Sequence, residues 1–340
     1  MKAFISGCAG PRLLPEEAAF FAREQPWGLI LFKRNCADAE SIRNLVRDFR
    51  FAVGRVDAPV LIDQEGGRVQ RLSPPGWPSY PPARALGQLA EHDAAAGERA
   101  AFLHARLIAA DLLDLGIDVD CLPLLDVVPG VSAAIGNRSF GADPAIAARL
   151  GRAVAEGLAA GGVLPVMKHI PGHGRGEADS HHALPVVDAD LDTLARTDFA
   201  PFVALADLPM AMTCHVVYTA IDPDNPATTS ATVIRDIIRR RIGFGGLLMS
   251  DDVSMNALSG DYGDRARRIF AAGCDLVLHC NGRIEEMRAV AEAAPALAGE
   301  AGGRAARALL ARREPQAFRR ADGRAELLEL AARVHWTPVA

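Results

Sequence analysis

The chain has 340 residues, of which 50% are hydrophobic and 23% charged, so it can bury a large core and is neither disordered nor collagen-like. Its formal net charge of −5 argues against a nucleic-acid partner. No stretch reaches the roughly 20 consecutive apolar residues that a membrane helix needs, and we therefore expect no membrane partner.

Short apolar runs recur along the chain and predict the strands of a parallel sheet. The eight runs are Ala3–Cys8, Trp27–Phe32, Pro59–Ile62, Ile117–Leu122, Gly162–Met167, Pro209–Cys214, Gly246–Met249 and Asp275–Leu278. They are almost continuously apolar and do not alternate with polar residues, which is typical of strands that are buried on both faces.

Helix-length segments rich in Ala, Leu and Arg separate these runs. Their boundary signals are Pro15 with Glu16 and Glu17 at a helix start, Asp143 and Thr229 with Ser230 as N-caps, and Gly116, Gly161, Gly243 and Gly273 after helix ends. Eight strand–helix units over roughly 295 residues predict a single (β/α)8 TIM barrel rather than a doubly wound sheet. We expect residues 1–298 to form this catalytic barrel, and residues 299–340 to form a short Arg-rich helical extension packed on it.

The six cysteines show no CxxC motif and no regular spacing, which predicts reduced thiols rather than a disulfide framework. Only a few apolar residues precede Gly7 and Pro11, too few for the hydrophobic region of a signal peptide. The sequence therefore predicts a cytoplasmic protein. It does not determine the oligomeric state.

Polar and ionisable residues are dense at one end of nearly every apolar run. In a TIM barrel the active site forms at the carboxyl ends of the strands, so these residues predict a lined pocket there. They are Lys33, Arg34 and Asn35, residues 63–68, Asp126, Lys168 and His169, His215, residues 250–252, and His279 with Asn281.

The segment 168–181 is the most informative stretch. Three glycines in five residues, at positions 172, 174 and 176, predict a loop that can bend and move. At the end of this segment Asp179 and His181 are two residues apart, so in an extended segment both side chains lie on one face. An Asp that accepts a hydrogen bond from Nδ1–H of a His leaves Nε2 free for proton transfer.

Such a pair needs a nucleophile as its third member. Asp251 or Asp252, at the end of the seventh apolar run, supplies a carboxylate. The sequence contains no G-x-S-x-G motif that would offer a serine instead. The alternative role of Ser250, Asp251 and Asp252 is to cap the helix that follows.

Five motifs resemble those of glycoside hydrolase family 3, specifically its single-domain β-N-acetylglucosaminidases. They are DQEGGRVQR at 63–71, GNRSF at 136–140, KHIPGHG at 168–174, Asp179-Ser180-His181, and SDDVSM at 250–255. The resemblance covers roughly residues 1–290 in the family's order. It implies a TIM barrel, the fold that the apolar runs also predict.

The resemblance implies a role for each matching residue. Asp251 corresponds to the nucleophile, His181 to the general acid/base and Asp179 to its partner. The residues that correspond to those holding the N-acetylglucosamine unit are Asp63, Arg71, Arg138, Lys168 and His169. The implied reaction is retaining hydrolysis of a terminal β-linked N-acetylglucosamine, without a cofactor or a metal. The implied small-molecule substrate is GlcNAc-1,6-anhydroMurNAc, with or without its peptide, in cytosolic peptidoglycan recycling.

Two parts of the chain depart from the family's pattern. Ser6-Gly7-Cys8 stands where many relatives carry an acidic residue, and the tail after about residue 298 matches no family motif. Three alternatives stay open. One is a metal-dependent hydrolase with His169, His173, His181 and Asp251 as ligands, although no H-E-x-x-H motif is present. The others are a family 3 enzyme that acts on β-glucosides and a sugar-binding barrel without activity. The sequence does not specify the preferred muropeptide, or whether phosphate can replace water.

Overall fold

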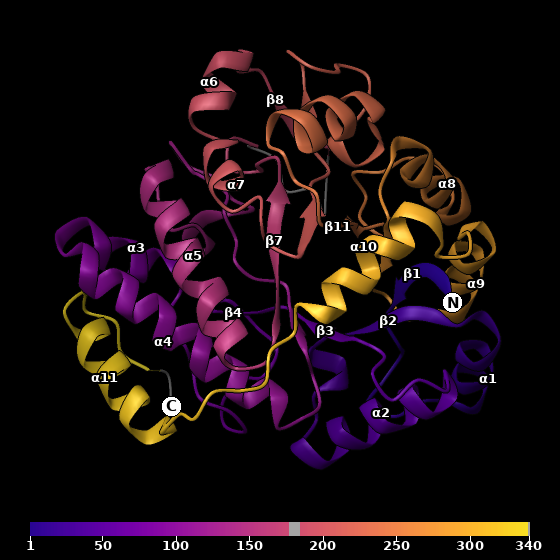
Figure 1. The fold of residues 1–340 in the computed structure, drawn as a ribbon, viewed down its shortest axis with the longest axis horizontal. Helices are drawn as coiled ribbons and strands as arrows, with labels where there is room; N and C mark the ends of the chain where they lie inside the picture. The colour runs from indigo at the N-terminus through magenta and orange to yellow at the C-terminus, as the bar shows by residue number, and fades with distance from the viewer. Residues whose placement is uncertain (177–183, 339–340) are drawn as a thin grey trace.

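The computed structural model describes residues 1–176 and 184–338, which form a closed barrel of eight parallel strands (Figure 1). The barrel strands are β1 (Lys2–Ser6), β2 (Pro26–Leu31), β3 (Val60–Ile62), β6 (Val119–Asp120), β7 (Leu164–Ile170), β9 (Met210–Thr213), β11 (Leu247–Asp252) and β12 (Leu276–His279). Each strand pairs with its neighbours in chain order, and β12 closes the barrel on β1. Each predicted apolar run coincides with one barrel strand, so the (β/α)8 prediction is confirmed.

Helices on the outside of the barrel connect the strands. They are α1 (Pro15–Glu24), α2 (Ala39–Ala52), α3 (Ala83–His92), α4 (Ala94–Leu113), α5 (Pro144–Ala160), α6 (Leu191–Arg196), α7 (Ala200–Ala204), the π-helix η4 (Val233–Arg241), α8 (Tyr262–Ala272) and α9 (Ile284–Ala293), with short 3-10 turns at η1 (Lys33–Asn35), η2 (Gly136–Arg138) and η3 (Ala227–Thr229). Two small sheets, β4 (Gln64–Gly66) with β5 (Val69–Gln70) and β8 (Val186–Val187) with β10 (Val217–Tyr218), lie in connections that follow barrel strands.

The helix boundaries follow the residues that predicted them. Asp143 caps α5 by accepting a hydrogen bond from the Ala145 amide at 2.8 Å, and Gly273 ends α8 in the left-handed conformation at φ +109°. Gly161 directly follows α5 with a φ of −91°, and the left-handed turn is made one residue later by Gly162, at φ +81°.

Three strands continue beyond their apolar runs, and all three extensions carry polar residues, with β12 ending at His279. β7 runs through Lys168 and His169 to Ile170, and β11 ends at Asp252. The hydropathy pattern ends where side chains become polar, whereas the backbone pairing continues, with Asp252 in register with Leu278. The polar side chains of β7 and β11 are therefore fixed by strand hydrogen bonds instead of lying in loops.

Two apolar layers hold the barrel together. Side chains inside the barrel include Ile5, Trp27, Leu61, Val119, Val166, Met210, Met249 and Leu278. A larger cluster fills the space between the strands and the surrounding helices. The six cysteines are free thiols, five of them buried. Among the described residues, no helix is long and apolar enough to cross a membrane.

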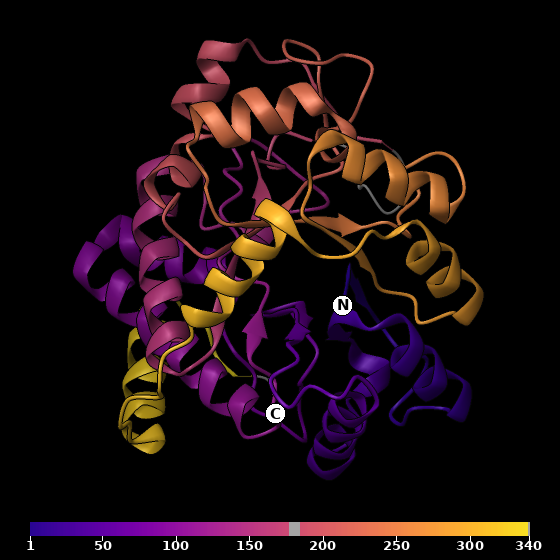
Figure 2. The same cartoon turned by 45° about the vertical axis from the view of Figure 1, so that its right-hand side comes forward.

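The C-terminal part covers one end of the barrel. Helix α10 (Gly299–Leu310) crosses the barrel, and α11 (Arg320–Ala332) lies at the periphery beside α4 (Figure 2). Arg304 binds Asp275, directly before β12, at 2.9 Å, and Arg312 binds Asp118, directly before β6, at 2.7 Å. Because both carboxylates precede their strands, α10 closes the amino-terminal end of the barrel and leaves the carboxyl end open.

Candidate active site

A cavity of about 220 Å³ opens at the carboxyl ends of the barrel strands. Its lining residues are Phe32, Asp63, Arg68, Val69, Arg71, Ala134, Ile135, Arg138, Lys168, His169, His173, Met212, Asp251, Asp252, Met255, Leu278 and Cys280. Six residues predicted to act in catalysis or sugar binding lie here together: Asp63, Arg71, Arg138, Lys168, His169 and Asp251.

A network of ion pairs lies at this cavity, and Asp63, Arg71, Arg138 and Lys168 are its members that line the cavity. The ammonium of Lys168, buried in β7, lies 2.7 Å from Asp63 Oδ1 and 2.6 Å from Glu65 Oε1. Arg71 binds the second oxygen of Asp63 at 3.1 Å, and Arg138 binds both oxygens of Glu65 at 2.7 and 2.9 Å. Two carboxylates and three cations thus share their charges in a place that is shielded from water.

The pKa values of the two carboxyls show which effect prevails in the network. Burial alone would raise the pKa of Asp63, but Lys168 and Arg71 outweigh burial and hold it well below its usual range. Burial is likewise outweighed at Glu65, where Arg138 and Lys168 lower the pKa to about 2. Both groups are therefore ionised at neutral pH and act as hydrogen-bond acceptors.

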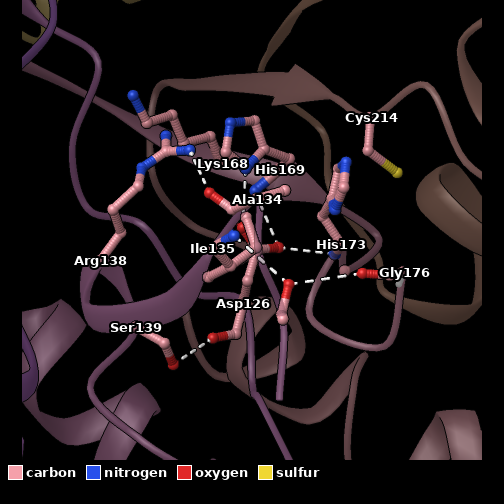
Figure 3. Close-up of polar contacts among 12 residues, drawn as sticks. Asp126, Ala134, Ile135, Arg138, Ser139, Lys168, His169, His173, Gly176 and Cys214 are labelled. Atoms are coloured by element: carbon pink, nitrogen blue, oxygen red, sulfur yellow. Dashed lines mark hydrogen bonds and ion pairs between the residues drawn. The ribbon is translucent and has the colours of Figure 1, made fainter. Parts of the chain in front are cut away.

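A second cluster centres on Asp126, in the loop after β6 (Figure 3). Its Oδ2 lies 2.6 Å from His169 Nδ1, and its Oδ1 accepts the His173 amide at 2.6 Å. The Asp126 carboxylate therefore favours a proton on His169 Nδ1 and leaves Nε2 to interact with a ligand in the cavity. Burial would raise the pKa of Asp126, but His169 lowers it. His173 lies beside His169, and burial lowers the pKa of its ring.

Asp251 and Asp252 are neighbours at the end of β11, but they have different partners. The Asp252 carboxylate accepts hydrogen bonds from the Ser254 amide and hydroxyl and from the Cys280 amide, so it holds together the loops after β11 and β12. Asp251 Oδ1 accepts the Asp252 amide at 2.8 Å, and within the described residues its Oδ2 accepts no hydrogen bond. Burial would raise the pKa of Asp251, but His215 and His169 lower it. Asp251 is thus an ionised carboxylate, and among residues 1–176 and 184–338 one of its oxygens has no hydrogen-bond donor.

Asp179 and His181, the predicted acid/base pair, lie outside the described residues. The structure does describe where the chain leaves for that segment. The Gly176 amide donates to the His173 carbonyl at 3.0 Å, and the Gly176 carbonyl accepts from the Ser132 hydroxyl at 3.3 Å.

Two residues of the site had no role in the sequence analysis. Glu65 lies in the DQEGGRVQR motif and Asp126 at a predicted strand end, so both were among the polar strand-end residues without an assigned partner. Their roles come from contacts with Arg138 and His169, each more than 40 positions away along the chain.

The absence of an acidic side chain after β1 also has a structural reason. A Cβ atom on Gly7 would lie 2.4 Å from the Cys280 carbonyl oxygen and 2.9 Å from the Arg34 guanidinium. Arg34 donates to the Cys8 carbonyl at 2.9 Å and also to the Cys280 carbonyl. Arg34 therefore fills the space where a longer side chain at position 7 would have to lie.

Sequence comparison assigns this site to a family. A profile of the glycosyl hydrolase family 3 N-terminal domain matches residues 12–302. The chain belongs to glycoside hydrolase family 3. As a member of that family it is a glycoside hydrolase, with its cavity at the carboxyl ends of a TIM barrel.

Individual relatives agree with this assignment. The beta-hexosaminidase of Bordetella avium is 40% identical over 279 residues, which cover 80% of this family 3 chain and 79% of that protein. NagZ from Neisseria gonorrhoeae, solved in complex with N-trifluoroacetyl-D-glucosamine, has a TM-score of 0.84 at 34% identity and covers 98% of this chain and 97% of its own. A family 3 β-N-acetylglucosaminidase from Paenibacillus sp. FPU-7 has a TM-score of 0.83 at 30% identity, and the match covers 98% of this chain and 66% of that longer protein.

Proposed function

We propose that this family 3 enzyme is a retaining exo-β-N-acetylglucosaminidase that uses Asp251 as its nucleophile. The observation that carries the proposal is the difference among the three described carboxylates that line the cavity. Asp63 is paired with Lys168 and Arg71, and Asp252 is held by backbone amides and a hydroxyl. Of these three, only Asp251 has a carboxylate oxygen that accepts no hydrogen bond from the described part of the chain, and this oxygen can attack an anomeric carbon.

The ion pairs of the cavity support binding of a terminal amino sugar. Asp63, Arg71, Arg138, Lys168 and His169 offer charged donors and acceptors, which make strong hydrogen bonds to the hydroxyl and acetamido groups of N-acetylglucosamine. The buried Lys168, paired with two carboxylates, lines the cavity, and we infer that a terminal rather than an internal sugar unit binds against it. The beta-hexosaminidase name of the Bordetella relative and the amino-sugar analogue bound to the Neisseria enzyme also support this substrate class.

The proposed mechanism has two steps. Asp251 attacks the anomeric carbon while the glycosidic C–O bond breaks, and His181, oriented by Asp179, gives its proton to the leaving oxygen. Neutral His181 then takes a proton from water, which attacks the glycosyl ester and releases Asp251 as a carboxylate. A histidine in this role adds no second negative charge beside Asp251. We propose GlcNAc-1,6-anhydroMurNAc and its peptides, in cytoplasmic peptidoglycan recycling, as the substrates.

A fluorinated N-acetylglucosaminyl donor with a good leaving group tests the nucleophile. Such a donor should inactivate the enzyme in a time-dependent manner, and mass spectrometry of the digest should place the label on the peptide that contains Asp251. A label on any other residue would overturn the assignment. Full activity after treatment with EDTA would count against the alternative of a metal-dependent hydrolase. A chromogenic β-glucoside, assayed in parallel with the N-acetylglucosaminide, tests the β-glucosidase alternative, which predicts faster hydrolysis of the β-glucoside.

A further inference from the structure

A buried histidine lies directly behind the proposed nucleophile. His215 follows β9, and its Nε2 lies 2.9 Å from the backbone carbonyl oxygen of Asp252. Its Nδ1 lies 2.9 Å from the Thr228 hydroxyl, which belongs to η3. A carbonyl oxygen can only accept a hydrogen bond, so His215 Nε2 must carry a proton in this arrangement.

The Thr228 hydroxyl then decides the state of the other ring nitrogen. Besides His215 Nδ1, this hydroxyl lies 2.8 Å from the Cys214 carbonyl and 2.8 Å from the Thr213 hydroxyl. A hydroxyl has one proton to donate and two lone pairs to accept. A carbonyl can only accept, so the Thr228 hydroxyl donates its single hydrogen bond to the Cys214 carbonyl. The Thr228 oxygen must then accept hydrogen bonds from the Thr213 hydroxyl and from His215 Nδ1.

The count of protons has one complete solution. The Asp251 amide donates to the Thr213 hydroxyl at 3.3 Å, the Thr213 hydroxyl donates to Thr228, and Thr228 donates to the Cys214 carbonyl. His215 Nδ1 then has to donate to Thr228 as well. If His215 were neutral, Thr228 would donate to Nδ1, and a buried carbonyl would face a hydroxyl oxygen at 2.8 Å with no proton between them.

We propose that His215 is a positioning residue, held with protons on both ring nitrogens, that keeps Asp251 ionised and fixes its backbone. The inference rests on the proposed role of Asp251. The network contacts the amide of Asp251 through Thr213 and the carbonyl of Asp252 through His215, so it holds the backbone immediately before Asp251 and immediately after Asp252. His215 touches no substrate atom and transfers no proton in the reaction.

The positive charge of His215 adds to those of other groups around Asp251 and favours its ionised form. Lys168 and His169 face it from β7, Asp252 is its neighbour on β11, and Asp126 and His173 lie next to His169. Among these surrounding groups His215 contributes most to the lowered pKa of Asp251, ahead of His169 and Lys168.

The experiment measures kcat/KM against pH for His215→Gln, with His92→Gln as the matched control. Glutamine keeps an N–H that can reach the Asp252 carbonyl but has no positive charge, whereas His92 is exposed at the end of α3, away from the cavity. We expect the acidic limb of the H215Q profile to move to higher pH by about one unit. At pH values below this limb, kcat/KM of H215Q should then be about tenfold lower than that of the wild type. The limb of H92Q should coincide with that of the wild type.

A second pair of variants tests the network independently of the histidine. Thr228→Val removes the hydroxyl that accepts from His215 Nδ1, whereas Thr228→Ser keeps it. T228V should shift the acidic limb in the same direction as H215Q, and T228S should restore the limb to the wild-type pH. If H215Q does not fold, the comparison of T228V with T228S tests the inference by the same measurement, the position of the acidic limb.

An unchanged acidic limb in folded H215Q, or equal limbs in T228V and T228S, would overturn the inference. Label mapping on the wild-type enzyme keeps this outcome separate from the proposed function. A label on Asp251 together with an unchanged H215Q limb rejects the role of His215 alone, whereas a label elsewhere rejects the nucleophile on which that role depends.

Discussion

Replacing Lys168 with methionine removes the cation that lies between two buried carboxylates. Lys168 is 1% exposed, and its ammonium lies 2.7 Å from Asp63 and 2.6 Å from Glu65. Methionine has nearly the same length and adds no charge, so Lys168→Met leaves two like charges in one buried place. Breaking a buried ion pair by removing one partner costs about 3–5 kcal/mol. We expect the lower end, about 3 kcal/mol, because Arg71 still pairs with Asp63 and Arg138 with Glu65.

This free energy converts into a measurable change in Tm. An unfolding entropy of about 2.1 cal/mol/K per residue predicts that 3 kcal/mol lowers the Tm of a chain this long by about 4 °C. Differential scanning calorimetry at pH 7 measures the shift. The matched control is Lys33→Met, the same substitution at an exposed lysine in η1, which should change Tm by less than about 1 °C.

The pH dependence of the shift tests its cause. Asp63 and Glu65 have lowered pKa values in the folded wild type, so they contribute stability above the unfolded pKa values of about 4, and this stability is lost as the pH falls toward the folded values. In K168M the pKa values of both carboxyls rise, so most of that contribution is missing already at neutral pH. The Tm difference should therefore be largest at pH 7 and smaller at pH 4. A Tm of K168M within 1 °C of the wild type at pH 7, or a difference that grows at pH 4, would refute the reasoning.

Three further predictions concern individual side chains of the site. Asp251→Ala should lower kcat/KM by about 10⁴-fold or more without loss of Tm. Asp252→Ala should lower Tm, because three hydrogen bonds are lost. Similar activities of the two variants would contradict the choice of nucleophile. Asp126→Asn should raise KM by at least about tenfold, since the amide no longer fixes the proton on His169 Nδ1, and an unchanged KM in steady-state assays would reject this role. His181→Ala should lose less activity on aryl substrates with good leaving groups than on alkyl ones, and equal losses would count against its role as general acid.

Local sequence patterns were sufficient to predict the fold. Strands buried on both faces need apolar side chains at every position, so each of the eight barrel strands was visible as a short apolar run. The same patterns located the site, because polar residues cannot follow a buried strand without reaching solvent or a cavity. Lys168, His169 and Asp251 were found in this way, although they belong to β7 and β11 and not to loops.

The tertiary structure decided how these residues pair. Asp251 and Asp252 are chemically identical neighbours. Only the positions of Ser254 and Cys280 show that both oxygens of Asp252 accept hydrogen bonds, whereas in the described structure one oxygen of Asp251 accepts none. Glu65 and Asp126 likewise acquire roles through residues distant in the chain, and so does the Thr228 hydroxyl that sets the protons of His215.

The C-terminal part shows the same division. Its Arg-rich helical character was visible in the sequence, but the cover that α10 forms over the amino-terminal end of the barrel depends on Arg304 meeting Asp275 and on Arg312 meeting Asp118. Hydrophobic periodicity and turn residues act over a few positions and can be read from the sequence. Hydrogen bonds between side chains depend on distances between separate strands, which only the closed barrel sets.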